Sequence, residues 1–513
     1  MEIATETELK LATRPSDLPA LTRLLEARAG GGPGREARLV STYFDTPDGA
    51  LASRGLTFRV REQDGRFIQT VKSSDGANGS GLALERGEWE DPVPDAHADP
   101  RAPQTGRFVA ALAADDLLAL VRTEICRRVL MLCPDARTRI EAAVDRGHVM
   151  ALQNDRREPI CEIELELKHG NITALYDFAL EMLAVAPVRL ERCSKSARGF
   201  RLSRSSADRQ PVAAVHAGTV ALDPDMASGL ALRRIAGSCV EQIVGNEAAV
   251  LDGMAEGVHQ MRVGVRRLRA ILSAFARLLP QCESRWFSDE LRWLGATLGI
   301  ARNLDVFANG LVAPAIRSAA GVSGMAALNA AVASRRAAAY ANAVEAIGST
   351  RYTALVLRLM RWSEAPGGGE DPSSPGLARS LGEIAPEILT HRLKVTRRRA
   401  ARFSKQSPED RHRLRIALKK LRYAVEMLGQ LYDRESAGIL LRAVKQLQEE
   451  LGDINDLRVS RDIVTELACG GADAAAIADA GAVVLDRRAR LLRQNERGVK
   501  KHAAKIREFI PFW

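Results

Sequence analysis

Alternating charge along one segment constrains the fold more than any other feature of this chain. Glu162, Glu164 and Glu166 alternate with apolar residues between positions 159 and 168. Successive side chains of a strand point to opposite faces, so the carboxylates share one face and the apolar side chains share the other. Ionisable residues take similar places on other predicted strands, as Glu6, Glu8 and Lys10, Arg59 and Arg61, Lys72, Arg86, Glu88 and Glu90, and Arg127 and Asp145. The pattern predicts a sheet with one ionic face.

The first 204 residues are predicted to be rich in strands. Apolar alternation or β-branched residues indicate strands at 3–13, 38–45, 56–63, 66–73, 83–91, 121–132, 138–151 and 159–168. Short helices are predicted at 16–29, 105–119 and 172–185. Eight antiparallel strands in about 170 residues favour a closed barrel. An ordinary small barrel has an apolar interior, and that arrangement stays open. If the lumen is ionic instead, the helices must cover the outward apolar face.

From about residue 222 the pattern becomes helical to the end. Segments rich in Ala, Leu and Arg follow a 3.6-residue period, and strand signals vanish. A stretch rich in Gly and Pro at 364–376 divides this region. We therefore predict an α+β chain: a β-barrel domain at 1–204, a linker at 205–221 and an all-α domain at 222–510, with halves 222–363 and 377–510.

The two helical halves repeat one another. His259-x-x-Arg262 matches His412-x-x-Arg415, and the pairs lie 153 residues apart. Leu298-Gly299 and Leu451-Gly452 share the same offset of 153 residues. Two separate motifs with one offset indicate an internal duplication, which predicts two packed antiparallel bundles.

Charge and cysteine content restrict the partner and the compartment. The net charge of +10 favours an anionic partner, and nucleic acid, polyphosphate and acidic membrane all fit that charge. The seven cysteines are scattered and form no CxxC pair, as expected for free thiols in a reducing compartment. The acidic start predicts no signal peptide, and no apolar run approaches the ~20 residues of a membrane span. We expect a cytoplasmic protein without a membrane partner.

The ionic face has the chemistry of a metal and phosphate site. Glu6, Glu8 and Lys10 place two carboxylates and an ammonium on one strand face. Mg²⁺ is commonly held by one or two carboxylates together with substrate phosphates. A solvated strand face of mixed charge is the alternative for this motif taken alone. The further charged strands favour the metal and phosphate interpretation.

Nearly the whole N-terminal domain resembles the CYTH family of triphosphate tunnel metalloenzymes. The resemblance rests on Glu6-x-Glu8-x-Lys10, Arg59-Val-Arg61, Lys72, Glu88, Thr123 to Arg127, Asp145-Arg-Gly147, the run from Glu162 to Glu166, and Ser194 to Arg201. It implies an eight-stranded antiparallel tunnel that binds a triphosphate with a divalent metal. The implied reaction is hydrolysis of inorganic triphosphate to pyrophosphate and phosphate.

The resemblance and the residue chemistry imply the same division of roles. Basic side chains would bind phosphate oxygens through charge-assisted hydrogen bonds: Lys10, Arg59, Arg61, Lys72 and Arg127, joined by Lys195 and Arg198. Glu6, Glu8 and two of Glu162, Glu164 and Glu166 would hold Mg²⁺ or Mn²⁺, and Asp145 or Glu88 would complete the metal shell or the water site. Hydrolysis of thiamine triphosphate or a nucleotide, or cyclisation of ATP, stays open because the same site chemistry serves each reaction.

One helix of each half carries a basic face. His259, Arg262, Arg266 and Arg269 fall within an arc of about 80°, and His412, Arg415, Lys419 and Arg422 repeat the layout. A solvated face is the alternative, but few acidic residues stand nearby to balance the charge. Residues 222–510 resemble the CHAD domain, which implies binding of inorganic polyphosphate and disfavours nucleic acid. A non-catalytic polyphosphate-binding protein is the alternative from another functional class.

Overall fold

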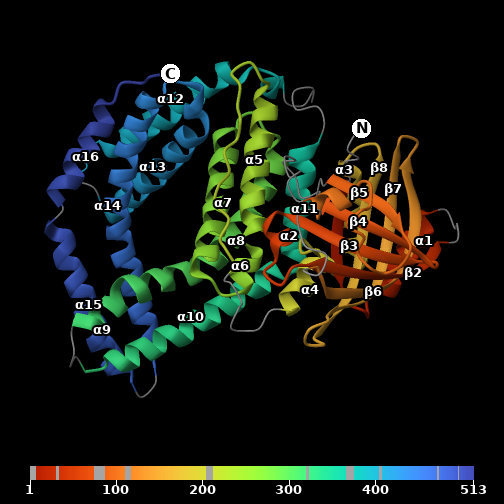
Figure 1. Cartoon of the computed structure of the whole chain (residues 1–513). Coiled ribbons are helices and arrows are strands. Elements are labelled where there is room, and N and C mark those ends of the chain that lie inside the picture. The colour runs from red at the N-terminus through yellow and green to blue at the C-terminus, as the bar shows by residue number, and fades with distance from the viewer. Residues whose placement is uncertain are drawn as a thin grey trace. The chain divides into compact units, whose positions relative to one another are not determined.

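The computed structural model describes residues 7–29, 34–73, 87–109, 117–203, 212–318, 323–365, 375–401, 403, 407–470, 473–494 and 496–513. The chain forms two compact units. The first is Met1–Pro211 with Gly348–Pro366, and the second is Val212–Ile347 with Gly367–Trp513. The first unit holds the sheet and the second is helical (Figure 1). The predicted α+β class is confirmed.

The sheet has nine antiparallel strands in the order β5-β4-β3-β2-β6-β7-β8-β1-β9. They are β1 (Thr7–Thr13), β2 (Arg35–Asp45), β3 (Leu56–Gln63), β4 (Arg66–Ser73), β5 (Gly87–Val93), β6 (Leu118–Asp135), β7 (Thr138–Ala151), β8 (Arg157–His169) and β9 (Val188–Leu190). Each of the eight predicted strand segments coincides with a strand, except that residues 3–6 and 83–86 lie outside the described part. The extra strand, β9, has three residues, too few for an alternating pattern to mark it.

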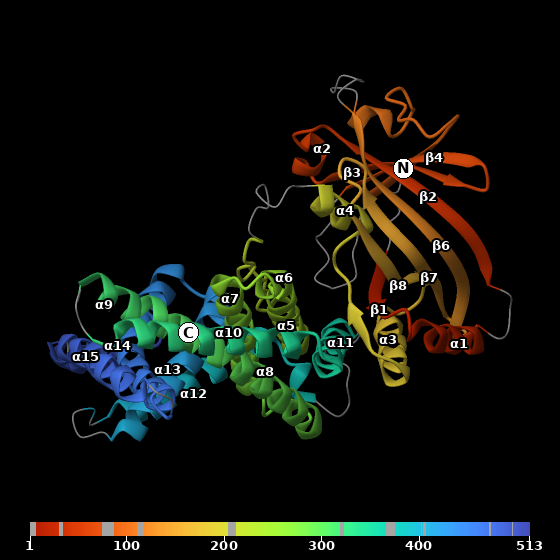
Figure 2. The same cartoon turned by 90° about the horizontal axis from the view of Figure 1, so that it is seen from below.

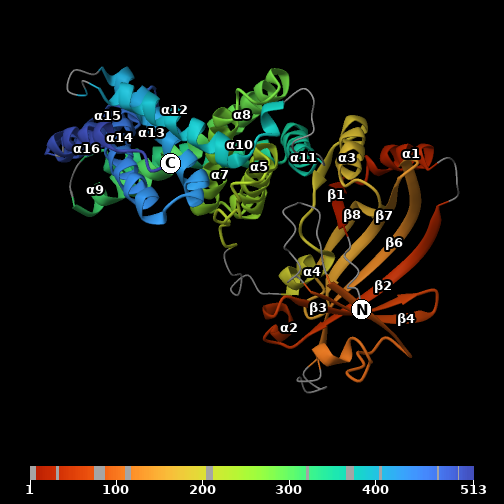
Figure 3. The ribbon, with the colours of Figure 1, turned by 90° about the horizontal axis from the view of Figure 1, so that it is seen from above.

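The face of β8 opposite its carboxylates is apolar and covered. Ile163 and Leu165 are fully buried. Helix α3 (Thr173–Val185) packs against β8, and α1 (Leu18–Arg28) packs against β6 and α3. Both views in Figures 2 and 3 show α1 and α3 side by side against the curved sheet. These helices match the predictions at 16–29 and 172–185, so the ionic face is left to line the interior.

The prediction of a helix at 105–119 is wrong for the residues of this range that the structure describes. Residues Gly106–Phe108 form a single 3₁₀ turn, and Leu118 already begins β6, so 118–119 are strand. Residues 110–116 lie outside the described part. Asp91 accepts hydrogen bonds from the backbone nitrogens of Gln104 and Thr105 at the start of this turn.

A helix from the downstream half of the chain belongs to the sheet unit. Helix α11 (Thr350–Glu364) packs against α3 and β9. The hydroxyl of Tyr176 donates a hydrogen bond to Glu364 Oε2 at 2.9 Å, and Arg361 pairs with Asp177. The segment predicted as part of the first helical half is therefore divided between the two units.

The second unit is built from long helices that include the repeated pair. Its main helices are α5 (Ser228–Gly245), α7 (Ala255–Ala274), α8 (Gln281–Phe307), α10 (Met325–Ile347), α12 (Leu381–Ala400), α13 (Pro408–Leu428), α14 (Arg434–Leu467), α15 (Ala474–Gln494) and α16 (Glu496–Glu508). The repeated helices α7 and α13 contact each other, and each buries its apolar stripe, such as Leu268 and Leu421. Within the described residues, no helix is both long and apolar enough to cross a membrane.

Candidate active site

The ionic face of the sheet encloses a cavity of about 270 Å³. Strands β1 to β8 and the start of helix α4 (Lys195–Ser203) contribute to its wall. Its charged lining residues are Glu8, Lys10, Arg59, Arg61, Lys72, Glu88, Glu90, Arg127, Glu141, Asp145, Glu164, Glu166 and Lys195. The cavity thus brings together most of the residues predicted for the site. Glu162 and Arg198 are buried next to it, and Glu6 lies outside the described residues.

Strand register places opposite charges directly across from one another. Lys10 faces Glu164, Lys72 faces Glu88, and Arg127 faces Asp145. The corresponding nitrogen–oxygen distances are 3.1, 3.1 and 2.7 Å. Opposite charges at facing positions stabilise neighbouring strands. The same pairing holds the charged side chains in place around the cavity.

Three buried carboxylates gather on one wall. Asp145, Glu162 and Glu164 each offer an oxygen, and these oxygens lie within 4.8 Å of one another. Asp145 and Glu162 face each other across β7 and β8. Oxygen donors at this spacing fit a hard cation such as Mg²⁺ or Mn²⁺. Glu166 lies apart, because its Oε1 pairs with Lys168 Nζ at 2.5 Å.

Lys195 of α4 reaches into this carboxylate group. Its Nζ lies 2.8 Å from Asp145 Oδ2 and 2.9 Å from Glu164 Oε1, and it also contacts Glu162. Helix α4 sits close to β6 because Gly199 has no side chain: a Cβ there would lie 2.1 Å from Val121 Cγ1.

Arg198 holds the outer side of the carboxylate group. It donates to Glu158 Oε1 at 2.8 Å and to the carbonyl of Pro159 at 2.6 Å, and its Nη1 lies 3.4 Å from Glu162 Oε2. These contacts of Arg198 are with the protein wall, and its predicted role in substrate binding stays a prediction. Glu8 is buried beside Lys10, with Oε1 3.2 Å from Nζ.

The charges on this wall stabilise one another. Burial alone would raise the pKa of Glu164, but Lys10, Lys195 and Arg127 outweigh it and hold the pKa well below its usual range. Burial alone would lower the pKa of Lys195, but Glu164, Asp145 and Glu162 outweigh it and raise the pKa. Glu164 and Lys195 are therefore both charged at neutral pH.

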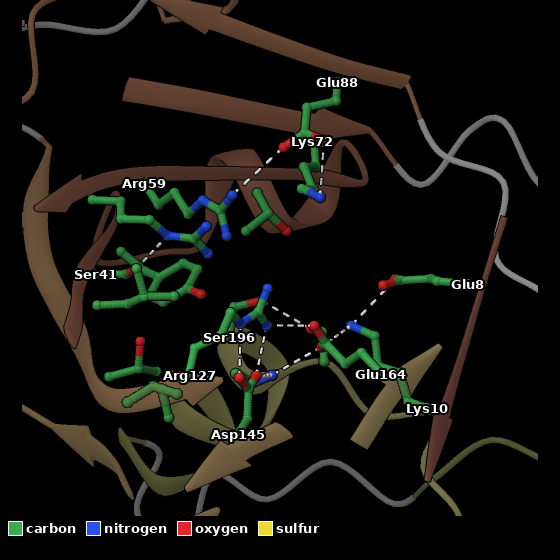
Figure 4. Close-up of a pocket in the computed structure, with 18 of the residues that line it drawn as sticks. Glu8, Lys10, Ser41, Arg59, Lys72, Glu88, Arg127, Asp145, Glu164 and Ser196 are labelled. Atoms are coloured by element: carbon green, nitrogen blue, oxygen red, sulfur yellow. Dashed lines mark hydrogen bonds and ion pairs between the residues drawn. The ribbon is translucent and has the colours of Figure 1, made fainter. Parts of the chain in front are cut away.

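The opposite wall carries cations with few carboxylates. Figure 4 shows Arg59, Lys72 and Glu88 across the cavity from Asp145 and Glu164. Burial and the neighbouring charge of Arg59 lower the pKa of Arg61 to about 10. The Nε of Arg59 is buried without a hydrogen-bond partner in the protein. These are the electrostatic conditions that an anion would relieve.

Ser41 and Tyr43 are neutral polar residues of the cavity that were not among the predicted site residues. Ser41 accepts a hydrogen bond from Arg61 Nε at 3.2 Å, and the Tyr43 hydroxyl lies beside the arginines. Burial alone would raise the pKa of Tyr43, but Arg59 and Arg61 lower it. Thr123, Ser194 and Ser196 also line the cavity. Ser41 and Tyr43 share one face of β2, and only the register of β2 against β3 places them opposite Arg61 and Arg59.

In the second unit, basic side chains of α7 and α13 converge. We call the set Arg262, Arg266, Arg415, Lys419 and Arg422 the basic seam. Burial and the charges of Arg415, Arg266 and Arg262 lower the pKa of Lys419 to about 7. The Nε atoms of Arg262 and Arg415 are buried without a hydrogen-bond partner. Carboxylates reach the seam only at its edge among the described residues, with Asp456 4.0 Å from Arg415 and Glu426 3.5 Å from Arg422.

The remaining predicted basic residues differ in position. His259 lies beside the seam, where burial and the charge of Arg302 lower its pKa and so favour the neutral imidazole. Arg269 is exposed, and burial of part of its side chain and the charge of Arg292 lower its pKa. His412 is exposed. The structure therefore brings together five of the eight predicted basic-face residues as the seam, with His259 beside it.

Two family models match the chain. The CYTH domain model matches residues 4–200, and the CHAD domain model matches residues 234–465. An inorganic triphosphatase of Haemophilus influenzae is 30% identical over 203 residues, which are 38% of this chain and 54% of that protein. An uncharacterized protein of Mycobacterium tuberculosis is 28% identical over 295 residues, 52% of each chain. The chain thus spans about half the length of the curated relatives it matches.

The helical region is similar to a domain whose structure has been solved. The crystal structure of the CHAD domain from the plant Ricinus communis has 34% sequence identity and a TM-score of 0.50. The match covers 57% of this chain and 96% of that chain.

Proposed function

We propose, from the premise that this chain carries a CYTH domain followed by a CHAD domain, that its cavity hydrolyses inorganic triphosphate to pyrophosphate and phosphate. The observation that carries the proposal is the division of the cavity into two walls. One wall groups Asp145, Glu162 and Glu164, and the other presents arginines that few carboxylates balance. A triphosphate with a divalent cation has the charge distribution that fits both walls.

The proposed roles follow from this division. Asp145, Glu162 and Glu164 would hold Mg²⁺ or Mn²⁺, with Glu8 beside them and Glu6 as a further candidate. The metal, when bound, would neutralise phosphate oxygens. Lys10, Arg59, Arg61, Lys72 and Arg127 would bind and orient the phosphate chain. Phosphoryl transfer depends mainly on such positioning and charge neutralisation, so no side-chain nucleophile is needed.

The lining of the cavity favours an inorganic chain over a nucleotide. Among the described lining residues, Tyr43 is the only aromatic one, and it is buried between arginines. A nucleobase would find no exposed ring on which to stack. Thiamine triphosphate or nucleotide hydrolysis and cyclisation of ATP are the competing reactions. A purely binding role is the competing class, and the grouped carboxylates argue against it because anion binding alone needs none.

Metal removal is expected to stop the reaction. With Mg²⁺ or Mn²⁺, each triphosphate should give one phosphate and one pyrophosphate, separated by ion-exchange chromatography. EDTA should reduce the rate by about 100-fold or more, because the bound metal would stabilise transition-state charge by several kcal/mol. Added metal should restore the rate. Equal rates with and without EDTA would contradict the metal role assigned to the carboxylate wall.

We further propose that the basic seam binds inorganic polyphosphate. The supporting observation is the convergence of cations from two repeated helices, with unpartnered buried nitrogens on Arg262 and Arg415. A polyanion would supply the missing acceptors and favour the charged form of Lys419. Nucleic acid is the competing partner. Displacement of bound polyphosphate by DNA at an equal concentration of phosphate charges would support nucleic acid as the ligand.

Replacing both Arg262 and Arg415 with alanine is expected to weaken polyphosphate binding by about tenfold or more, because each substitution removes charge-assisted contacts to the phosphates. The measurement is calorimetric titration of the full chain with polyphosphate. A matched control replaces Arg379 and Arg490, which are exposed and paired with Glu383 and Asp486. The control should keep its polyphosphate affinity, and triphosphate turnover should be unchanged in both variants. Unchanged affinity in the seam variant would contradict the assignment.

The cytoplasm is the location we propose. All seven cysteines are free in the structure. Free thiols suit a reducing compartment.

A further inference from the structure

Every oxygen of the three grouped carboxylates already contacts a cation of the protein. Asp145 accepts two parallel hydrogen bonds from Arg127, at 2.7 and 2.6 Å. Glu164 contacts Lys10 and Lys195 through Oε1 and Arg127 through Oε2. Glu162 contacts Lys195 through Oε1 and Arg198 through Oε2. A metal at this group would therefore compete with protein cations for the same oxygens.

Lys195 is the cation that contacts all three carboxylates. Its Nζ lies 2.8 Å from Asp145 Oδ2 and 2.9 Å from Glu164 Oε1, and it also contacts Glu162. A divalent cation bonds oxygen at about 2.0–2.6 Å, so it and the ammonium would compete for the same oxygens. Two like charges so close together also repel each other.

The two arginines at this group, Arg127 and Arg198, are held more firmly than a lysine. Arg127 binds Asp145 with both arms of a planar guanidinium, and such bidentate pairs are geometrically specific. Arg198 is anchored by Glu158 and the carbonyl of Pro159. Lysine, in contrast, is a point charge on a flexible four-carbon stem. Lys10 is also a lysine, but of the three carboxylates it pairs with Glu164 alone. Lys195 is therefore the flexible cation whose movement would free all three carboxylates.

We propose that Lys195 is a tethered counter-ion that competes with the divalent metal at Asp145, Glu162 and Glu164. Without metal, its ammonium keeps the three carboxylates together. When metal binds, the ammonium moves out of the group and becomes available to the phosphate chain. Lys195 itself lines the cavity, with Ser194 and Ser196 on either side, so the displaced ammonium can stay within the cavity. This inference rests on the metal site of the proposed function.

The test compares Lys195→Met with the wild type by titration of Mn²⁺ into the metal-free full chain. We expect Mn²⁺ to bind Lys195→Met about tenfold more tightly, because the ammonium no longer competes for three charge-assisted contacts. In EDTA the variant should melt at a lower temperature than the wild type, because the carboxylates repel one another. Mn²⁺ should therefore raise its melting temperature more than that of the wild type.

Lys168→Met is the matched control. Lys168 pairs with Glu166 at 2.5 Å and lies 3.9 Å from Glu141, and neither of these two carboxylates belongs to the group of three. Its Mn²⁺ affinity should equal that of the wild type. Equal or weaker Mn²⁺ binding by Lys195→Met than by the wild type would overturn the competition while leaving the metal site intact. Absence of Mn²⁺ binding in all three proteins would overturn the proposed metal site, and this inference with it.

Discussion

Replacing Glu164 with glutamine is expected to lower the turnover of inorganic triphosphate by about 1000-fold, the scale on which loss of a charge-stabilising group acts. The carboxylate contacts Lys10, Lys195 and Arg127 and belongs to the group that would hold the metal. An amide removes the negative charge and turns a donor toward the two ammonium groups. The measurement is the initial rate of phosphate release with saturating Mg²⁺.

Glu166→Gln is the control for this prediction. Glu166 lies on the same face of β8, but its carboxylate pairs with Lys168 and stands outside the grouped oxygens. We expect its turnover to fall by less than about tenfold, as for a group that is not a direct ligand. A larger loss of turnover in Glu166→Gln than in Glu164→Gln would show that the proposed metal ligands are the wrong carboxylates.

Replacing Asp145 with alanine is expected to destabilise the sheet by about 3–5 kcal/mol, the cost of leaving buried charges without their partner. Asp145 is fully buried, and both Arg127 and Lys195 form ion pairs with it. Hydrogen exchange in the full chain measures this locally: amides of β6, β7 and β8 should exchange faster by about 100-fold or more.

Two comparisons control the Asp145 experiment. Amides of α14, in the other unit, should exchange as in the wild type. Asp145→Asn should give an intermediate effect, because it keeps the shape and one hydrogen-bond acceptor. Unchanged protection of β7 in Asp145→Ala would show that the buried ion pairs add little to the stability of the sheet.

The sequence was sufficient to predict the strands because their charges alternate. A run such as Glu162, Glu164 and Glu166 has a period of two, which fixes both the element and its ionic face. Helix α11 shows the limit of such patterns. Its apolar periodicity specifies a helix but not the surface that the helix covers, so its packing against α3 was not predictable.

The candidate site was predictable in its residue types but not in its grouping. Glu162, Glu164 and Glu166 are equivalent by alternation, and only the register of β7 against β8 puts Asp145 opposite Glu162. A slip of one residue would reverse every side chain, and no local signal sets the register. The position of Lys195 depends on how α4 packs against β6. The sequence shows a glycine at 199 but not that this glycine lets the helix approach the strand. The basic face of α7 was predicted as one set, but a helical wheel cannot tell which residues α13 faces.

The most direct test of the account is the initial rate of phosphate release from inorganic triphosphate, ATP and thiamine triphosphate, each with Mg²⁺, Mn²⁺ or EDTA. The account predicts fast release from inorganic triphosphate that EDTA abolishes, and much slower release from the two organic substrates. Faster release from ATP or thiamine triphosphate, or no release from any of the three, would contradict it.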